Sequence, residues 1–209
     1  MYVGGENMKN LVGILLLVFV ITVGFSGVVS AADGHNKSVK KQHKYTDRHF
    51  IENMVPHHKE AVLMSNIALK RGEHPEIRHL ARNIKSSQSR EIKEMSQWYK
   101  KWYGRNVPTS SMMSHRMSMM NSVDLNKLKT AELFDKEFIK QMVPHHQMAI
   151  MMAQMALKNS KRHKIRNLAN SIVKTQSTEI KEMGRWYKQW YGTNLPASHG
   201  MMGSKMMNG

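Results

Sequence analysis

Cysteine is absent from this chain of 209 residues, and acidic side chains are scarce, with 15 Asp and Glu against 32 Lys and Arg. Without cysteine the chain has no disulfide framework, no thiolate zinc site and no cysteine nucleophile. Long apolar runs are also missing outside the N-terminal region. What the chain has in excess is 20 Met and 12 His, together with a formal net charge of +17. The flexible thioether normally serves sparingly as a core filler, so this methionine content indicates a function.

The N-terminal region is the one place with an almost unbroken apolar run, from Leu11 to Val29, preceded by a lysine and followed by Ser-Ala-Ala. This order is typical of a secretory signal peptide, which we assign to residues 1–32. The alternative is an uncleaved anchor, because the run approaches the roughly 20 residues that span a bilayer. Both interpretations predict an exported, periplasmic or extracellular protein, and only the second predicts contact with a membrane.

Most of the remaining chain is an internal repeat. The segment Met-Val-Pro-His-His at residues 54–58 returns at residues 142–146, an offset of 142 − 54 = 88, and the same offset relates many residues around it. About half of residues 47–108 are identical in the second copy, which indicates a duplication. Whatever one copy does, the other is expected to do as well.

Within each copy the apolar residues recur at three- and four-residue steps, which is the period of an amphipathic helix. In the first copy one such stripe begins at Phe50 and a second ends at Gly104, with a turn predicted at residues 71–75. Each copy is thus predicted to form a helical hairpin, over residues 45–108 and 130–196. Because each hairpin has one apolar face per helix, two of them close a core as an all-α four-helix bundle.

Low-complexity segments flank the hairpins: a flexible basic lead over residues 33–44, a linker over 109–129 and a flexible tail over 197–209. The linker and the tail are rich in Met and His set among Ser, Gly and Asn, where the thioethers have no core to enter. Packing therefore does not explain methionine where it is densest, and metal capture is the favoured interpretation there.

The repeated motif has the chemistry of a soft-metal site. Thioether and imidazole ligands suit Cu(I), and by analogy Ag(I), better than hard cations. In a helix, Met54 lies three and four residues before His57 and His58 and shares their face. Folding the hairpin back at its turn sets Met95 near Met54. The predicted metal ligands are Met54, His57, His58 and Met95, and in the second copy Met142, His145, His146 and Met183.

Several neighbouring positions have supporting or alternative roles in such a site. Met64 and Met152 match each other in the repeat and are included as ligands, with core packing an equal alternative. Glu91 and Glu179 are candidates to accept the free ring N–H of a ligating His, which would fix its tautomer and orientation. The proline before each His pair either kinks the helix or begins it. The Trp and Tyr residues late in each copy are assigned to packing at the bundle ends.

Paired Met-x-Pro-His-His elements, each followed by Ala, Met and a downstream Glu-Ile-x-x-Met, resemble the CopM-type family of exported, ferritin-like proteins, catalogued as a domain of unknown function. The resemblance covers both hairpins and not the tails. It implies a ferritin-like bundle that binds copper through Met and His and contributes to copper tolerance outside the cytoplasm. Carried over by position, the implied copper ligands are the same eight Met and His residues.

We therefore predict a protein that sequesters or shuttles Cu(I), or Ag(I), without an organic cofactor; a copper exporter or another copper chaperone is the expected partner. No enzymatic activity is expected, since the Glu-x-x-His pair of a di-iron oxidase is not repeated: Glu76 and His79 are matched by Lys164 and Asn167. The alternative is a basic bundle that binds an anionic cell-surface polymer or lipid through its charge. Nucleic acid is not an expected partner of an exported protein.

Overall fold

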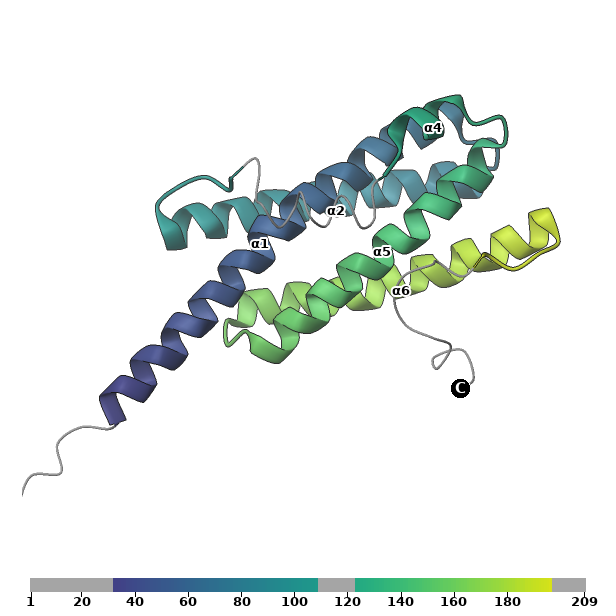
Figure 1. The fold of residues 1–209 in the computed structure, drawn as a ribbon. Coiled ribbons are helices and arrows are strands. Elements are labelled where there is room, and N and C mark those ends of the chain that lie inside the picture. Colours follow the sequence, from purple (N-terminus) through teal and green to yellow (C-terminus); the bar gives the residue numbers. More distant parts are fainter. Residues whose placement is uncertain (1–31, 109–122, 197–209) are drawn as a thin grey trace, which may run out of the picture.

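A computed structural model describes residues 32–108 and 123–196, with side chains from residue 47 onward in the first range. The chain there is helical and without strands, as predicted (Figure 1). The predicted signal peptide (apart from Ala32) and the Met- and His-rich parts of the linker and tail lie outside these residues. None of the described helices is long and apolar enough to cross a membrane. The helices are α1 (Ala32–Arg71), α2 (Pro75–Tyr103), α4 (Leu125–Thr130), α5 (Phe134–Asn159) and α6 (His163–Tyr191).

Two predicted boundaries are wrong. Residues 33–44, expected to be a flexible lead, continue α1 as helix. They contain Lys and Gln, which favour helix, and no proline that would interrupt it. The end of the predicted linker over residues 109–129 is also helical. There Asp124 caps α4 by accepting a hydrogen bond from the Lys127 N–H at 2.8 Å, and Leu128 is buried.

The predicted turn and stop signals are confirmed. The chain turns between Arg71 and Pro75, and α2 ends before Gly104, which has a φ of 72° and donates its N–H to the Lys100 carbonyl at 2.9 Å. This left-handed conformation favours glycine because it has no Cβ. Pro56 lies inside α1, as its counterpart lies inside α5, so the motif's proline does not begin the helix.

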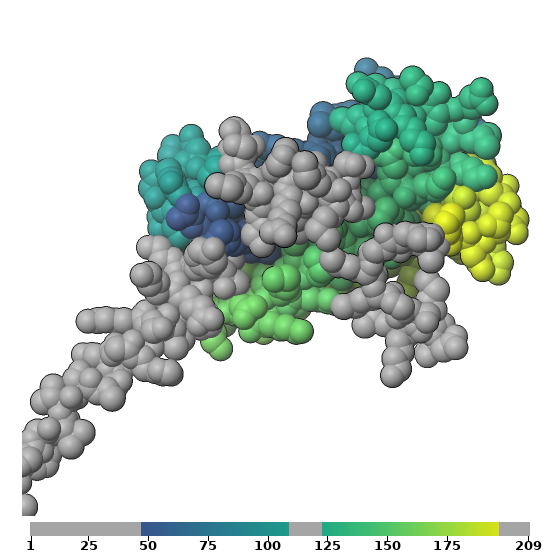
Figure 2. Space-filling view, in the orientation of Figure 1, coloured from purple at the N-terminus to yellow at the C-terminus, as the bar shows by residue number. Residues whose placement is uncertain are grey.

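The two hairpins, α1 with α2 and α5 with α6, meet mainly through α1 and α5 (Figure 1). In the space-filling view they lie directly against each other (Figure 2). Two apolar cores result, each combining the bend end of one hairpin with the open end of the other. The 88-residue repeat relates the cores, since Ala61, Met64 and Ile77 lie in one and Ala149, Met152 and Ile165 in the other. The bundle is therefore approximately two-fold symmetric.

The bend of the first hairpin is tied to the second by a buried aspartate. Asp135, in the first turn of α5, accepts hydrogen bonds from the backbone N–H groups of Glu73 at 3.1 Å and His74 at 2.8 Å. The same carboxylate lies 2.7 Å from His74 Nδ1, and the His74 ring stacks on Trp190 at 3.7 Å. We call these contacts the His74 latch.

An equivalent latch holds the bend of the second hairpin. Asp47, buried in α1, lies 2.9 Å from Arg162 Nε, and the Arg162 guanidinium lies 4.2 Å from the centre of the Trp102 ring. We call these contacts the Arg162 latch. Together the two latches set the hairpins relative to each other and place Trp102 and Trp190 near the ends of the bundle.

Candidate metal centre

Four histidines occupy the layer between the two apolar cores, two from α1 and two from α5. The rings of His57 and His145 lie against each other, with centroids 3.7 Å apart and planes tilted by 31°. His58 and His146 flank this pair, with ring centroids 6.4 Å from His57 and 6.3 Å from His145. The duplicated motif thus meets itself across the interface of α1 and α5, close to the two-fold axis.

A glutamate orients one histidine of each pair. Glu91 Oε2 lies 2.7 Å from His58 Nε2, and Glu179 Oε2 lies 2.8 Å from His146 Nε2. A carboxylate accepts here and Nε2 donates, so Nδ1 is the ring nitrogen that remains available to a metal ion. The expected hydrogen bond between these glutamates and the motif is therefore present, and it selects the second histidine of each pair.

The histidine layer holds six buried ring nitrogens without a hydrogen-bond partner: both nitrogens of His57 and His145, and Nδ1 of His58 and His146. Unpaired buried polar atoms are costly and call for an explanation. Burial lowers the pKa of His57 and of His145 well below its ordinary value of 6.5, and neighbouring histidines lower it further. Both rings are therefore neutral at pH 7, which is the form that binds metals.

The six methionines predicted as ligands are all buried and divide between the two cores, as Met54, Met95 and Met152 in one and Met64, Met142 and Met183 in the other. The structure therefore places Met54 in one core with Met95, and Met142 in the other core with Met183. Met64 of the first copy, however, lies in the core of Met142 and Met183, and Met152 of the second copy lies in the core of Met54 and Met95. Each core thus holds two buried thioethers from one copy and one from the other.

Three polar residues of the layer were missed as site residues. Glu60 places a carboxylate oxygen 3.6 Å from His145 Nε2, too far for a hydrogen bond, and burial raises the pKa of Glu60. Gln88 and Gln176 are buried with their Oε1 atoms unpartnered. Their identity across the repeat was the available signal. The contact between His57 and His145 could not be predicted in this way, because the sequence of one copy does not indicate which residues of the other copy it packs against.

The donor set of the described residues is soft. Among these residues, no three His, Asp or Glu side chains form a group that could hold a metal ion. The sulfur donors in the adjoining cores are thioethers, which together with imidazole suit soft ions such as Cu(I).

A cleft between α2 and α6 reaches the glutamate that holds His58. Its volume is about 570 Å³, and the Glu91 side chain at its wall is 15% exposed. Lys164 Nζ lies 5.7 Å from the centre of the Trp98 ring in the same cleft. The histidine layer is therefore buried but close to solvent on this side. The lining residues are Arg90, Glu91, Glu94, Trp98, Lys164, Asn167, Leu168 and Ser171.

Comparison with known proteins gives a family and several solved structures. The family model described as a domain of unknown function, DUF305, matches residues 47–187 and 135–209. CopM in the Cu(I)-bound form is similar with 49% identity and a TM-score of 0.65, over 70% of this chain and 98% of that one. CopM in an Ag-bound form is 48% identical, with a TM-score of 0.63 over 70% and 98% of the two chains.

One further solved structure shares the fold at lower identity, and one curated protein matches by sequence over part of its length. A DUF305 protein of known structure from Streptomyces coelicolor is 26% identical, with a TM-score of 0.64 over 74% of this chain and 98% of that one. Protein L153 of Acanthamoeba polyphaga mimivirus, which is uncharacterized, is 32% identical over 89 residues. That match covers 43% of this chain and 55%, about half, of the viral protein.

Proposed function

The chain belongs to the DUF305 family, and from this premise we propose that it is a copper-binding protein that acts outside the cytoplasm. It holds Cu(I), or Ag(I) by the same chemistry, at two equivalent Met and His sites and so sequesters or shuttles the ion for metal tolerance. The ion is cargo, and the protein performs no catalysis on it.

One observation carries this proposal: six buried ring nitrogens of the histidine layer have no partner. In each pair, the Nε2–H of the second histidine donates a hydrogen bond to a glutamate, and Nδ1 is left to bind a metal ion. A bound cation would satisfy these lone pairs. The buried thioethers next along each helix, Met54 in α1 and Met142 in α5, would complete a neutral, soft ligand set.

The relatives support the choice of ion. CopM, which matches both hairpins at 48–49% identity, has been solved in Cu(I)-bound, Cu(II)-bound and Ag-bound forms. A ligand set of thioethers and imidazoles favours Cu(I) over Cu(II), since neutral sulfur is a soft donor. Thioethers also form no disulfides, so the absence of cysteine suits a site in an oxidising compartment.

The proposed route is supported by the sequence outside the described residues, and the proposed partner by the need to deliver the ion. The apolar N-terminal segment supports export, either as a cleaved signal peptide or as an anchor. The Met- and His-rich segments near residues 110–122 and 197–209 would capture or exchange the ion that the folded sites hold. The partner would be a copper exporter or another copper chaperone, because a held ion must be delivered or removed.

An anaerobic Cu(I) titration against a competing chelator tests the proposal. Two site variants are compared with the mature protein. The first replaces the four histidines of the layer with alanine, and the second replaces Met54, Met95, Met142 and Met183 with leucine, which keeps the core volume. Tight binding is expected to be lost in the first and weakened in the second, with helicity unchanged.

The matched control is the variant His79→Ala, His163→Ala, which removes exposed histidines from α2 and α6 and should bind like the wild type. Salt provides a second control. Binding of an anionic polymer through the chain's +17 charge would weaken steeply with ionic strength, whereas binding of Cu(I) to neutral sulfur and nitrogen would not. Weak Cu(I) binding by the wild type would contradict the proposal and favour the charge-driven alternative. Cu(I) binding by both site variants with the affinity of the wild type would do the same.

A further inference from the structure

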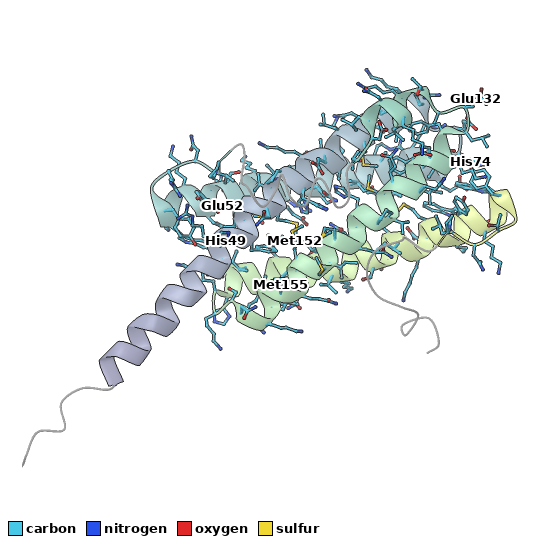
Figure 3. The ribbon with its side chains drawn as sticks, in the orientation of Figure 1. His49, Glu52, His74, Glu132, Met152 and Met155 are labelled. Carbon is cyan, nitrogen blue, oxygen red and sulfur yellow. The ribbon has the colours of Figure 1, made fainter. Side chains whose placement is uncertain are left out.

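A line of thioethers leads from the buried core to solvent along α5. Met152 is 8% exposed and Met155 is 54% exposed, while Met148 and Met151 have intermediate exposure. At steps of three and four residues, these side chains share one face of the helix. Figure 3 labels Met152 and Met155, at the buried and the exposed side of this face. We call Met148, Met151 and Met155 the α5 methionine stripe.

The first copy lacks the stripe. The positions equivalent to Met148, Met151 and Met155 in α1 are Glu60, Leu63 and Ile67. Leu63 is 49% exposed, so an apolar side chain without sulfur occupies this position of the fold. Packing therefore does not require three thioethers on α5. A soft donor ligand is the property that methionine has and leucine or isoleucine does not.

The repeat predicts that the stripe begins beside the central histidines. Glu60 lies 3.6 Å from His145 Nε2. The 88-residue repeat relates Glu60 to Met148 and His145 to His57, so the approximate two-fold symmetry predicts that Met148 takes the equivalent position beside His57. Both ring nitrogens of His57 are buried without a hydrogen-bond partner. One side of the histidine layer thus has a carboxylate, and the other side is expected to have the first thioether of the stripe.

We propose that the α5 methionine stripe is a separate outer site for one soft monovalent ion, Cu(I) or Ag(I), through which His57 is loaded. This inference rests on the proposed function, since it supplies the path to the same central layer. The ion moves by exchange of neutral ligands, from Met155 and Met151 to Met148 and then to His57. No electron or proton is transferred, because thioethers and neutral imidazole bind the ion without ionising.

The test uses the variant Met148→Leu, Met151→Leu, Met155→Leu, with Ag(I) as the probe and ¹³C-methyl methionine NMR as the readout. In the wild type, Ag(I) is expected to shift the methyl resonances of all three methionines. The variant is expected to bind one Ag(I) fewer and to take up Cu(I) from a chelator more slowly, while the ions at the central layer remain bound. Leucine is close in volume, so helicity should be unchanged.

The reciprocal variant Glu60→Met, Leu63→Met, Ile67→Met installs the stripe on α1 and should gain one Ag(I). Its Ag(I) stoichiometry also tests the outer site if the leucine variant fails to fold. Wild-type binding with no shift of the three methyl resonances, or a leucine variant with unchanged stoichiometry and uptake, would overturn the outer site alone. No Ag(I) or Cu(I) binding by the wild type would overturn the proposed function together with it.

Discussion

The two hairpins make the same histidine–carboxylate contact at the centre of the bundle. The distance is 2.7 Å between His58 and Glu91 in the first hairpin and 2.8 Å between His146 and Glu179 in the second. The two histidines of each motif also have nearly the same relative orientation, with ring planes at 55° and 51°. At the periphery the hairpins differ. One bend is latched by His74 and the other by its repeat equivalent, Arg162.

The comparison separates shared from individual roles. Contacts that both copies keep lie in the layer to which we assign ion binding. Contacts that differ lie at the latches, on the outer face of α5 and where Glu60 approaches His145, and they affect stability and ion exchange. We therefore expect variants at the centre to have equal effects in the two copies, and variants at the periphery to have unequal ones.

The largest effect is expected from acidification of the metal-free protein. The pKa values of His57 and His145 are lowered in the folded state, so below pH 6.5 the unfolded chain takes up protons that the folded chain does not. Stability is therefore complete above pH 6.5 and falls as the pH drops from there toward the lowered pKa values. The limiting slope is about 1.4 kcal/mol per pH unit for each histidine.

Urea unfolding at a series of pH values measures this slope. The single variants His57→Gln and His145→Gln should each halve it, and the double variant should abolish it. Unequal reductions of the slope by the two single variants would show that the centre is less symmetric than the contacts indicate. A flat profile in the wild type would contradict the buried, neutral state of the two rings.

Next in size is the effect of the orienting glutamates on ion affinity. Glu91→Gln and Glu179→Gln should each weaken Cu(I) binding at their own site by about 10- to 100-fold, the usual effect of removing a hydrogen-bond partner of a ligand. Chelator competition measures the affinity. Glu94→Gln, from the same cleft, is the matched control and should change little. A loss in one copy only would contradict the equivalence of the two sites.

The latches should differ in their contribution to stability. Arg162→Ala removes one ion-pair partner of buried Asp47 and is expected to cost about 2 kcal/mol, less than a fully buried pair because Arg162 is 40% exposed. His74→Ala should cost about 1 kcal/mol, because Asp135 keeps hydrogen bonds from two backbone N–H groups, those of residues 73 and 74. Denaturant unfolding measures the loss of stability in both variants. A greater loss for His74→Ala would contradict the prediction that the Arg162 latch contributes more.

The smallest effect is expected from Met64→Leu. Because leucine nearly conserves volume, the free energy of unfolding should fall by less than about 1.5 kcal/mol. Met64 shares its core with Met142 and Met183, so any weakening of Ag(I) binding should occur at the second site. Methyl resonances of Met183 and Met95 distinguish the two sites. Weakening at the site of Met95 would contradict this grouping.

The sequence by itself determined the local structure. The spacing of apolar residues, the turn at residues 71–75 and the stop at Gly104 are properties of short segments, and each is found as predicted. The repeat also predicted that both copies would have the same contacts, including the glutamate beside a histidine. The helical lead was missed because low complexity was taken for flexibility in a segment without any helix-breaking proline.

Only the tertiary structure decided which residues of the two copies meet. Helical periodicity specifies the face that a side chain occupies, but it carries no information on the angle, direction or register at which another helix packs there. The stacking of His57 on His145, the exchange of Met64 and Met152 between cores, and the proximity of Glu60 to His145 all depend on that packing. A sequence repeat thus predicts two equal sites, whereas the approximate two-fold axis joins them into one layer.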